Sequence, residues 1–174
     1  MANQDVSLSK DSTIYTYKLV QRINHSLYKK GLYFAVLIAL CIQQVGIGNW
    51  LELLISYPLI LLMHHIIAKT HFYFTGGNLL KNWSYQFGVF WNGVLPSGYS
   101  SMRLVVQTQL HILWIGILLL SGLFPWVSEA FIVNLTFLHI WIFMPRLWAF
   151  IRFRKYHKNG LMKITDKDTS CYLP

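Results

Sequence analysis

Residues 110–124 read LHILWIGILLLSGLF, and this run contains no charged side chain. With the polar residues that precede it, the segment covers about residues 102–124. About 20 apolar residues are enough for a helix to cross the hydrocarbon core of a bilayer. Because a helix satisfies its own backbone hydrogen bonds where water is absent, we expect a transmembrane helix here.

Three further apolar segments cover about residues 31–48, 50–68 and 130–150. Of the 174 residues, 55% are hydrophobic and 12% are charged, whereas soluble domains carry about 25% charged residues. This composition excludes a disordered chain, a fibre and an ordinary soluble globule. The four segments therefore predict an all-α integral membrane protein with four transmembrane helices.

The fifteen Lys and Arg residues are distributed unevenly along the chain. Five fall in residues 1–30, three in residues 69–108 and seven in residues 146–174. By the positive-inside rule, both termini and the middle loop are expected to face the cytoplasm. A basic nucleic-acid-binding protein would instead gather its charges on one folded face, so we expect no nucleic-acid partner.

These patterns predict three parts of the chain. They are a basic cytoplasmic segment at residues 1–30, a four-helix membrane domain at residues 31–151 and a tail at residues 152–174 that passes from basic to polar. The polar N-terminal segment does not have the pattern of a secretory signal peptide. We therefore expect a multi-pass protein of the cell membrane, and the short loops favour a bacterial plasma membrane.

The middle loop, residues 69–101, is long but not hydrophilic. Its apolar residues follow helical spacing, and they are Leu80, Trp83, Phe87, Phe90, Trp91 and Val94. An amphipathic segment of this kind can lie in the membrane interface or re-enter the membrane and pack against the bundle. We expect its aromatic residues to contact lipid or a partner protein, and we expect Arg146 to neutralise a lipid phosphate.

Four histidines lie within or near the predicted spans, and they are His64, His65, His111 and His139. Imidazole is the commonest metal-binding side chain, and a helical bundle can build a metal or haem site from facing helices. No two of these histidines have the i, i+4 spacing of a local metal pair. A metal or haem site and a set of structural, hydrogen-bonded histidines therefore both remain open.

The layout resembles a bacterial family of small zincin-like membrane peptidases. The resemblance rests on the loop GVFWNGVLPSGYSSMRLVV at residues 88–106, the tail MKITDKDTSCYL at residues 162–173, and the stretch HHIIA at residues 64–68. Family members carry His-Glu-x-x-His near the end of the second helix, where two histidines bind zinc and the glutamate activates water.

The diagnostic motif of that family is broken in this chain. His64 matches the first zinc ligand, but His65 stands in place of the glutamate and Ala68 in place of the second histidine. No acidic residue stands near Pro145, where a downstream ligand would fall. Zinc hydrolysis needs about three protein ligands and an open position for water. The resemblance therefore implies an inactive relative that holds a transmembrane segment of a partner.

The leading hypothesis is a non-catalytic membrane protein that binds another membrane protein or lipid and needs no cofactor. One alternative is a divergent zinc metallopeptidase that uses His64 and His65 together with His111 or His139. Another is a haem-binding bundle for electron transfer in which His65, His111 and His139 supply axial ligands. A transporter is a fourth hypothesis, although the sequence contains no internal inverted repeat.

Overall fold

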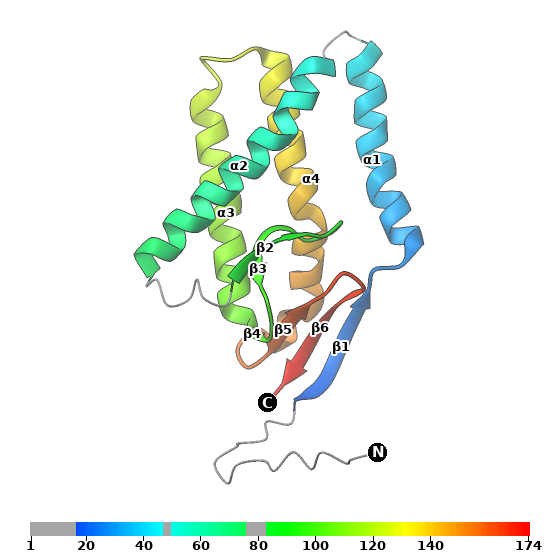
Figure 1. Cartoon of the computed structure of the whole chain (residues 1–174), viewed down its shortest axis with the longest axis vertical. Helices are drawn as coiled ribbons and strands as arrows, with labels where there is room; N and C mark the ends of the chain where they lie inside the picture. Colours follow the sequence, from blue (N-terminus) through cyan, green and yellow to red (C-terminus); the bar gives the residue numbers. More distant parts are fainter. Residues whose placement is uncertain (1–16, 47–49, 76–82) are drawn as a thin grey trace, which may run out of the picture.

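The computed structural model describes residues 17–46, 50–75 and 83–174. Within these residues the chain forms four long helices (Figure 1). They are α1 (Leu27–Gly46), α2 (Trp50–Thr75), α3 (Met102–Leu123) and α4 (Glu129–Phe153). A helix is thus confirmed in each of the four predicted segments. Helices α2, α3 and α4 are long and apolar enough to cross a membrane, and a crossing by α1 stays a prediction.

Helix α2 crosses the bundle obliquely and packs against both α3 and α4, and α3 also packs against α4. The main helical neighbour of α1 is α2. The end of α1 and the start of α2 lie at the same end of the molecule as the link between α3 and α4. Helices α1 and α2 therefore run antiparallel, and so do α3 and α4.

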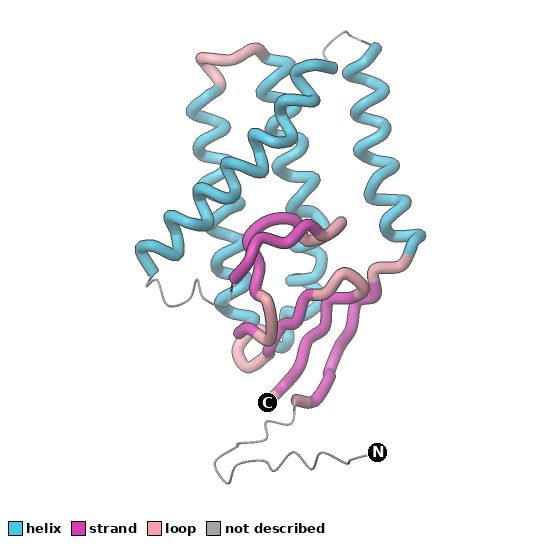
Figure 2. The backbone as a smooth tube through the Cα atoms, viewed as in Figure 1, coloured by secondary structure: helices cyan, strands magenta, loops and turns pink. Residues whose placement is uncertain are grey.

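The expectation of an all-α protein is wrong, because the segments that flank the helices form strands. A four-stranded antiparallel sheet has the order β1-β6-β5-β4. Its strands are β1 (Lys18–Asn24), β4 (Ser100–Ser101), β5 (Leu161–Ile164) and β6 (Asp168–Leu173). Figure 2 shows this sheet beyond the helices, at the end of the molecule where the C-terminus lies.

The sheet joins the N-terminal and C-terminal segments of the chain. Strand β1 pairs with β6, so that Asn24 lies opposite Asp168 and Arg22 opposite Ser170. An ion pair of 2.8 Å between Arg22 Nε and Asp168 Oδ2 reinforces this pairing. On β5, Met162 and Ile164 are buried while their neighbours are less so, which is the two-residue period of a strand with one buried face.

The middle segment is also not the amphipathic helix that its spacing predicts. Residues after α2 form an antiparallel hairpin of β2 (Trp83–Phe87) and β3 (Asn92–Pro96). Gly93 has φ of 125°, a conformation that favours glycine, and a side chain at Gly88 would meet the carbonyl oxygen of Trp91 at 2.8 Å. The two glycines therefore favour a turn in a segment rich in aromatic, strand-forming residues.

The hairpin belongs to the core at the sheet end of the bundle. Trp83, Trp91 and Leu95 are buried there in one apolar cluster with residues of the helices and the sheet, among them Phe72, Phe150 and Met162. A second cluster, which includes Ile60, Leu135 and Ile142, lies among the helices. The hairpin is thus packed against the bundle, and its position in the membrane interface or within the membrane stays a prediction.

Candidate functional site

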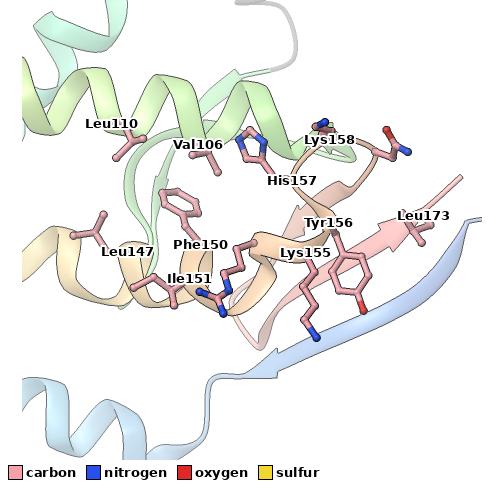
Figure 3. A pocket seen from close by; sticks show the side chains of 12 residues that line it. Val106, Leu110, Leu147, Phe150, Ile151, Lys155, Tyr156, His157, Lys158 and Leu173 are labelled. Carbon is pink, nitrogen blue, oxygen red and sulfur yellow. The ribbon is translucent and has the colours of Figure 1, made fainter.

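A cavity of about 1020 Å³ lies between the sheet-proximal ends of α3 and α4 (Figure 3). We call it the α3–α4 cleft. Its apolar lining residues are Val106 and Leu110 from α3, Leu147, Phe150 and Ile151 from α4, and Leu173 from β6. Its polar lining residues follow α4 directly, and they are Arg154, Lys155, Tyr156, His157, Lys158 and Asn159.

The apolar lining follows from helical periodicity. Val106 and Leu110 are four residues apart on α3, and Leu147, Phe150 and Ile151 have the i, i+3, i+4 spacing of one helix face on α4. Figure 3 shows the α3 side chains on one side of the cleft and those of α4 on the other. The two helices thus supply two apolar walls that face each other.

The polar lining is placed by the turn that ends α4. A short 3-10 helix, η2 (Arg154–Tyr156), continues α4, and Gly160 then donates its N–H to the carbonyl of Tyr156 at 2.7 Å. A side chain at Gly160 would lie 2.5 Å from that carbonyl oxygen, so this tight turn needs glycine. The carbonyl of Gly160 accepts from the N–H of Met102 at 2.9 Å, which fixes the turn to the start of α3.

Among the described residues, the charged side chains that line the α3–α4 cleft are all basic. Arg154, Lys155 and Lys158 are exposed, and among the described residues none of the three makes an ion pair. The described residues that line the cleft include no Asp or Glu. Lys and Arg close to an apolar surface are suited to bind anionic groups, since the cation stays hydrated while the carbon stem packs on the apolar wall.

A second polar group lies inside the bundle around Arg146, of which only 2% is exposed. Its guanidinium donates to Gln109 Oε1 of α3 at 2.6 Å and to the backbone carbonyl of Asn92 in the hairpin. The ring centroid of Phe143 lies 4.9 Å from its central carbon. The expectation that Arg146 meets lipid is therefore wrong, because its side chain turns inward and ties α4 to α3 and to the hairpin.

Two of the four candidate histidines meet inside the bundle. His64 Nε2 and His139 Nδ1 are 2.8 Å apart, and His139 Nε2 lies 3.1 Å from the carbonyl oxygen of Leu113. Since a carbonyl only accepts, His139 carries its proton on Nε2, and His64 donates from Nε2 to the bare Nδ1 of His139. Both nitrogens of His139 are thus used in hydrogen bonds between α2, α3 and α4.

The other two histidines lie elsewhere. The ring of His65 is 5.9 Å from that of Tyr85, and the ring of His111 stacks on that of His71 at 4.6 Å. Within the described residues, no group of three His, Cys, Asp or Glu side chains could hold a metal ion. The donors present there do not fit the zinc site that the family resemblance implies, and the resemblance itself stays a prediction.

The aromatic residues of the middle segment divide into two groups. Trp83 and Trp91 are buried within the chain, and Trp91 Nε1 donates to Thr169 Oγ1 of β6 at 2.8 Å. The expectation that these two contact lipid or a partner is wrong, because the hairpin turns them toward the core. Phe90 is partly buried against Tyr33, with ring centroids 5.4 Å apart, whereas Phe87 is 83% exposed and its partner stays a prediction.

Sequence reasoning missed the α3–α4 cleft, although its signal is present in the chain. Residues 147–158 read LWAFIRFRKYHK, an apolar helix face followed directly by a basic cluster. The sequence alone identifies the cluster as a marker of orientation and as part of a basic tail suited to a membrane partner, but it does not place the cluster at a cleft. No protein-family model, curated protein or solved structure matches the chain.

Proposed function

We propose that this chain is a multi-pass membrane protein that binds the head group of an anionic phospholipid in the α3–α4 cleft. The observation that carries the proposal is the junction of a cationic rim with an apolar floor in one cavity. Basic pockets between transmembrane helices on the cytoplasmic side are suited to anionic lipid head groups. The expected cytoplasmic orientation of this end of the bundle agrees with that role.

The dimensions of α4 support a lipid as the occupant. Leu147 and Arg154 are separated by about 10 Å along the helix axis, at 1.5 Å per residue. With α3 and α4 across a bilayer, this offset would set Leu110 and Leu147 at the depth of the acyl chains and Arg154 at the depth of the phosphates. One lipid molecule could then contact both parts of the cleft at once.

Lipid is favoured over a partner protein by charge. The rim carries three cations, and the described residues of the lining include no acid, so an anionic head group complements it directly. A partner protein would have to supply both an acidic patch and an apolar helix face in the same geometry. The charge of the rim therefore favours lipid as the occupant, and the experiment below distinguishes lipid from a protein partner.

The test is the affinity of the full-length purified protein for a fluorescent phosphatidylglycerol in neutral-lipid nanodiscs. The variant R154Q/K155Q/K158Q removes the cationic rim, and its three positions are exposed. Each Lys or Arg near an anionic lipid surface contributes about 1 kcal/mol, so we expect affinity to fall by on the order of 100-fold. A fluorescent phosphatidylcholine should bind wild type and variant equally weakly.

The matched control is K69Q/R103Q/K167Q, which removes three exposed cations from outside the cleft. It should keep most of the wild-type affinity for phosphatidylglycerol. An equal loss in both triple variants would mean that net charge alone attracts the lipid and would contradict the proposal. The rim variant could instead bind phosphatidylglycerol as tightly as wild type does. If a membrane protein that contacts the cleft also copurifies with the wild type, the occupant is a protein partner.

A further inference from the structure

A second cavity, of about 470 Å³, lies between α1 and α4. We call it the α1–α4 cavity. It does not share a lining residue with the α3–α4 cleft. The two helices are joined beside it by Tyr33 of α1 and Trp141 of α4, whose rings stack at 4.1 Å with an interplanar angle of 12°. Trp141 Nε1 also donates to the carbonyl of Tyr33 at 3.1 Å.

The walls of the α1–α4 cavity are mainly aromatic and aliphatic. Its aromatic lining residues are Tyr33, Phe90, Trp91, Trp141 and Trp148. Its aliphatic residues include Leu32 and Val36 of α1 and Met144 of α4, which are all exposed on the outside of the described helices. The cavity therefore borders a surface that would face the acyl chains of a bilayer.

One end of the cavity is polar. Lys29, in the first turn of α1, lies there with His25 and Thr169. Its ammonium donates to the carbonyl of Asn24 at 2.9 Å and lies 5.6 Å from the ring centroid of Trp148. Within the described residues Lys29 makes no ion pair. An ammonium group held at the end of an apolar cavity is placed to bind an anionic head.

We infer that the α1–α4 cavity binds a single-chain anionic amphiphile of the fatty-acid class, with the carboxylate at Lys29 and the chain against Trp141 and Trp148. The size and charge of the cavity decide against a two-chain phospholipid. Its volume is less than half that of the α3–α4 cleft, and it offers one lysine where the cleft offers three cations. Ligand cavities of this kind are mainly apolar, with a few polar groups that fix orientation.

The test is photolabelling of the full-length purified protein with a diazirine analogue of palmitate, followed by mapping of the labelled peptides. We expect label on α1 and α4 around the cavity and competition by palmitate. V36W fills the cavity from a position that is partly exposed, and it should abolish this label. I66W places the same side chain on an exposed position of α2 outside the cavity and should leave the label unchanged.

The role of the cation is tested with K29Q against its neighbour K30Q, which is not part of the lining. K29Q should weaken competition by palmitate by about fivefold, the contribution expected of one lysine near an anionic head. Competition by hexadecanol, which has no charge, should be the same in both variants. The R154Q/K155Q/K158Q variant should be labelled to the same extent as wild type. This comparison separates ligand binding in the α1–α4 cavity from lipid binding in the α3–α4 cleft.

Three results would overturn the inference. Label spread evenly over the outer faces of α2, α3 and α4 would identify the ligand as bulk lipid around the helices. Equal competition by palmitate in K29Q and K30Q would show that Lys29 does not bind the head group. Loss of label in I66W as well as V36W would also count against the cavity, since either substitution would then act through the fold.

Discussion

His64 of α2 donates a hydrogen bond to His139 of α4 over 2.8 Å, and His139 donates in turn to the backbone of α3 at Leu113. This chain of two hydrogen bonds connects three helices at one level of the bundle. The carbonyl of Leu113 can only accept, so His139 carries its proton on Nε2, and its bare Nδ1 then requires the proton of His64 to be on Nε2. The histidine pair therefore connects the three helices and contributes to the stability of the bundle.

Replacement of His64 by leucine should destabilise the protein. The substitution leaves Nδ1 of His139 without its donor in a buried position, which costs about 1–3 kcal/mol of the free energy of unfolding. The measurement is reversible unfolding in mixed micelles. His111→Leu is the control, since His111 is exposed and, within the described residues, its one side-chain hydrogen bond is to a carbonyl of its own helix, Gln107. A larger loss in the control than in His64→Leu would contradict the structural role.

Gly116 of α3 makes room for the His139 ring. A methyl group at this position would overlap Cε1 of that ring. Gly116→Ala should therefore lower the free energy of unfolding by about 1–3 kcal/mol through overpacking. Gly122→Ala, on the same helix with open space around it, should instead be neutral or stabilising by up to about 1 kcal/mol. Equal effects in the two variants would refute the contact.

Arg146 holds the hairpin onto the helices through the carbonyl of Asn92. Arg146→Met should free the hairpin, because it removes the hydrogen bonds to Asn92 and Gln109, each worth about 1.5–3 kcal/mol when the donor is charged. Amide hydrogen exchange should speed up in residues 83–96 more than in α3. Arg103→Met, at an exposed position near the start of α3, is the control. Unchanged exchange in the hairpin would contradict the tether.

The pairing of β1 with β6 should weaken in acid. Burial raises the pKa of Asp168, but hydrogen bonds from Ser170 and Thr165 and the charge of Arg22 outweigh it and hold the pKa below 3.8. A carboxyl whose pKa is lowered by folding stabilises the fold above its unfolded pKa, and this stabilisation is lost as the pH falls through the folded pKa. We therefore expect faster amide exchange in β1 and β6 below about pH 4.

The variant Asp168→Asn separates the weakening of the β1–β6 pairing by protonation of Asp168 from that by protonation of His25. Burial lowers the pKa of His25 below 6.5, so its protonation also opposes folding as the pH falls, but at a higher pH. In the variant, amide exchange in β1 and β6 should still speed up below pH 6.5, but the further increase below about pH 4 should be absent. If the wild type and Asp168→Asn respond alike down to pH 3, the ion pair with Arg22 does not control the strand pairing.

The helices could be predicted from sequence because their signal is local. The expected start of the second segment at residue 50 and the expected third segment at residues 102–124 agree closely with α2 and α3. A run of apolar residues long enough to cross a bilayer needs no knowledge of the rest of the chain. The uneven distribution of Lys and Arg predicts their cytoplasmic side by the positive-inside rule, and that orientation stays a prediction.

The sheet and the polar contacts could not be predicted because their partners are distant in sequence. Strand β1 finds its partner β6 across most of the chain, and His64 is 75 residues from His139. In the middle segment, apolar spacing compatible with a helix misled the prediction. The local signal that favoured a hairpin was the pair Gly88, which lies in its turn, and Gly93, which lies at the start of β3 opposite Gln86.

The most direct test of lipid binding in the α3–α4 cleft is to map where a phosphatidylglycerol with a photoreactive acyl chain labels the protein in a bilayer. We expect label concentrated on residues 106–110 and 147–151, the two apolar walls of the cleft, and its loss from both in R154Q/K155Q/K158Q. Label distributed evenly over the bundle, or label in the cleft that is unchanged in the variant, would contradict lipid binding in the cleft.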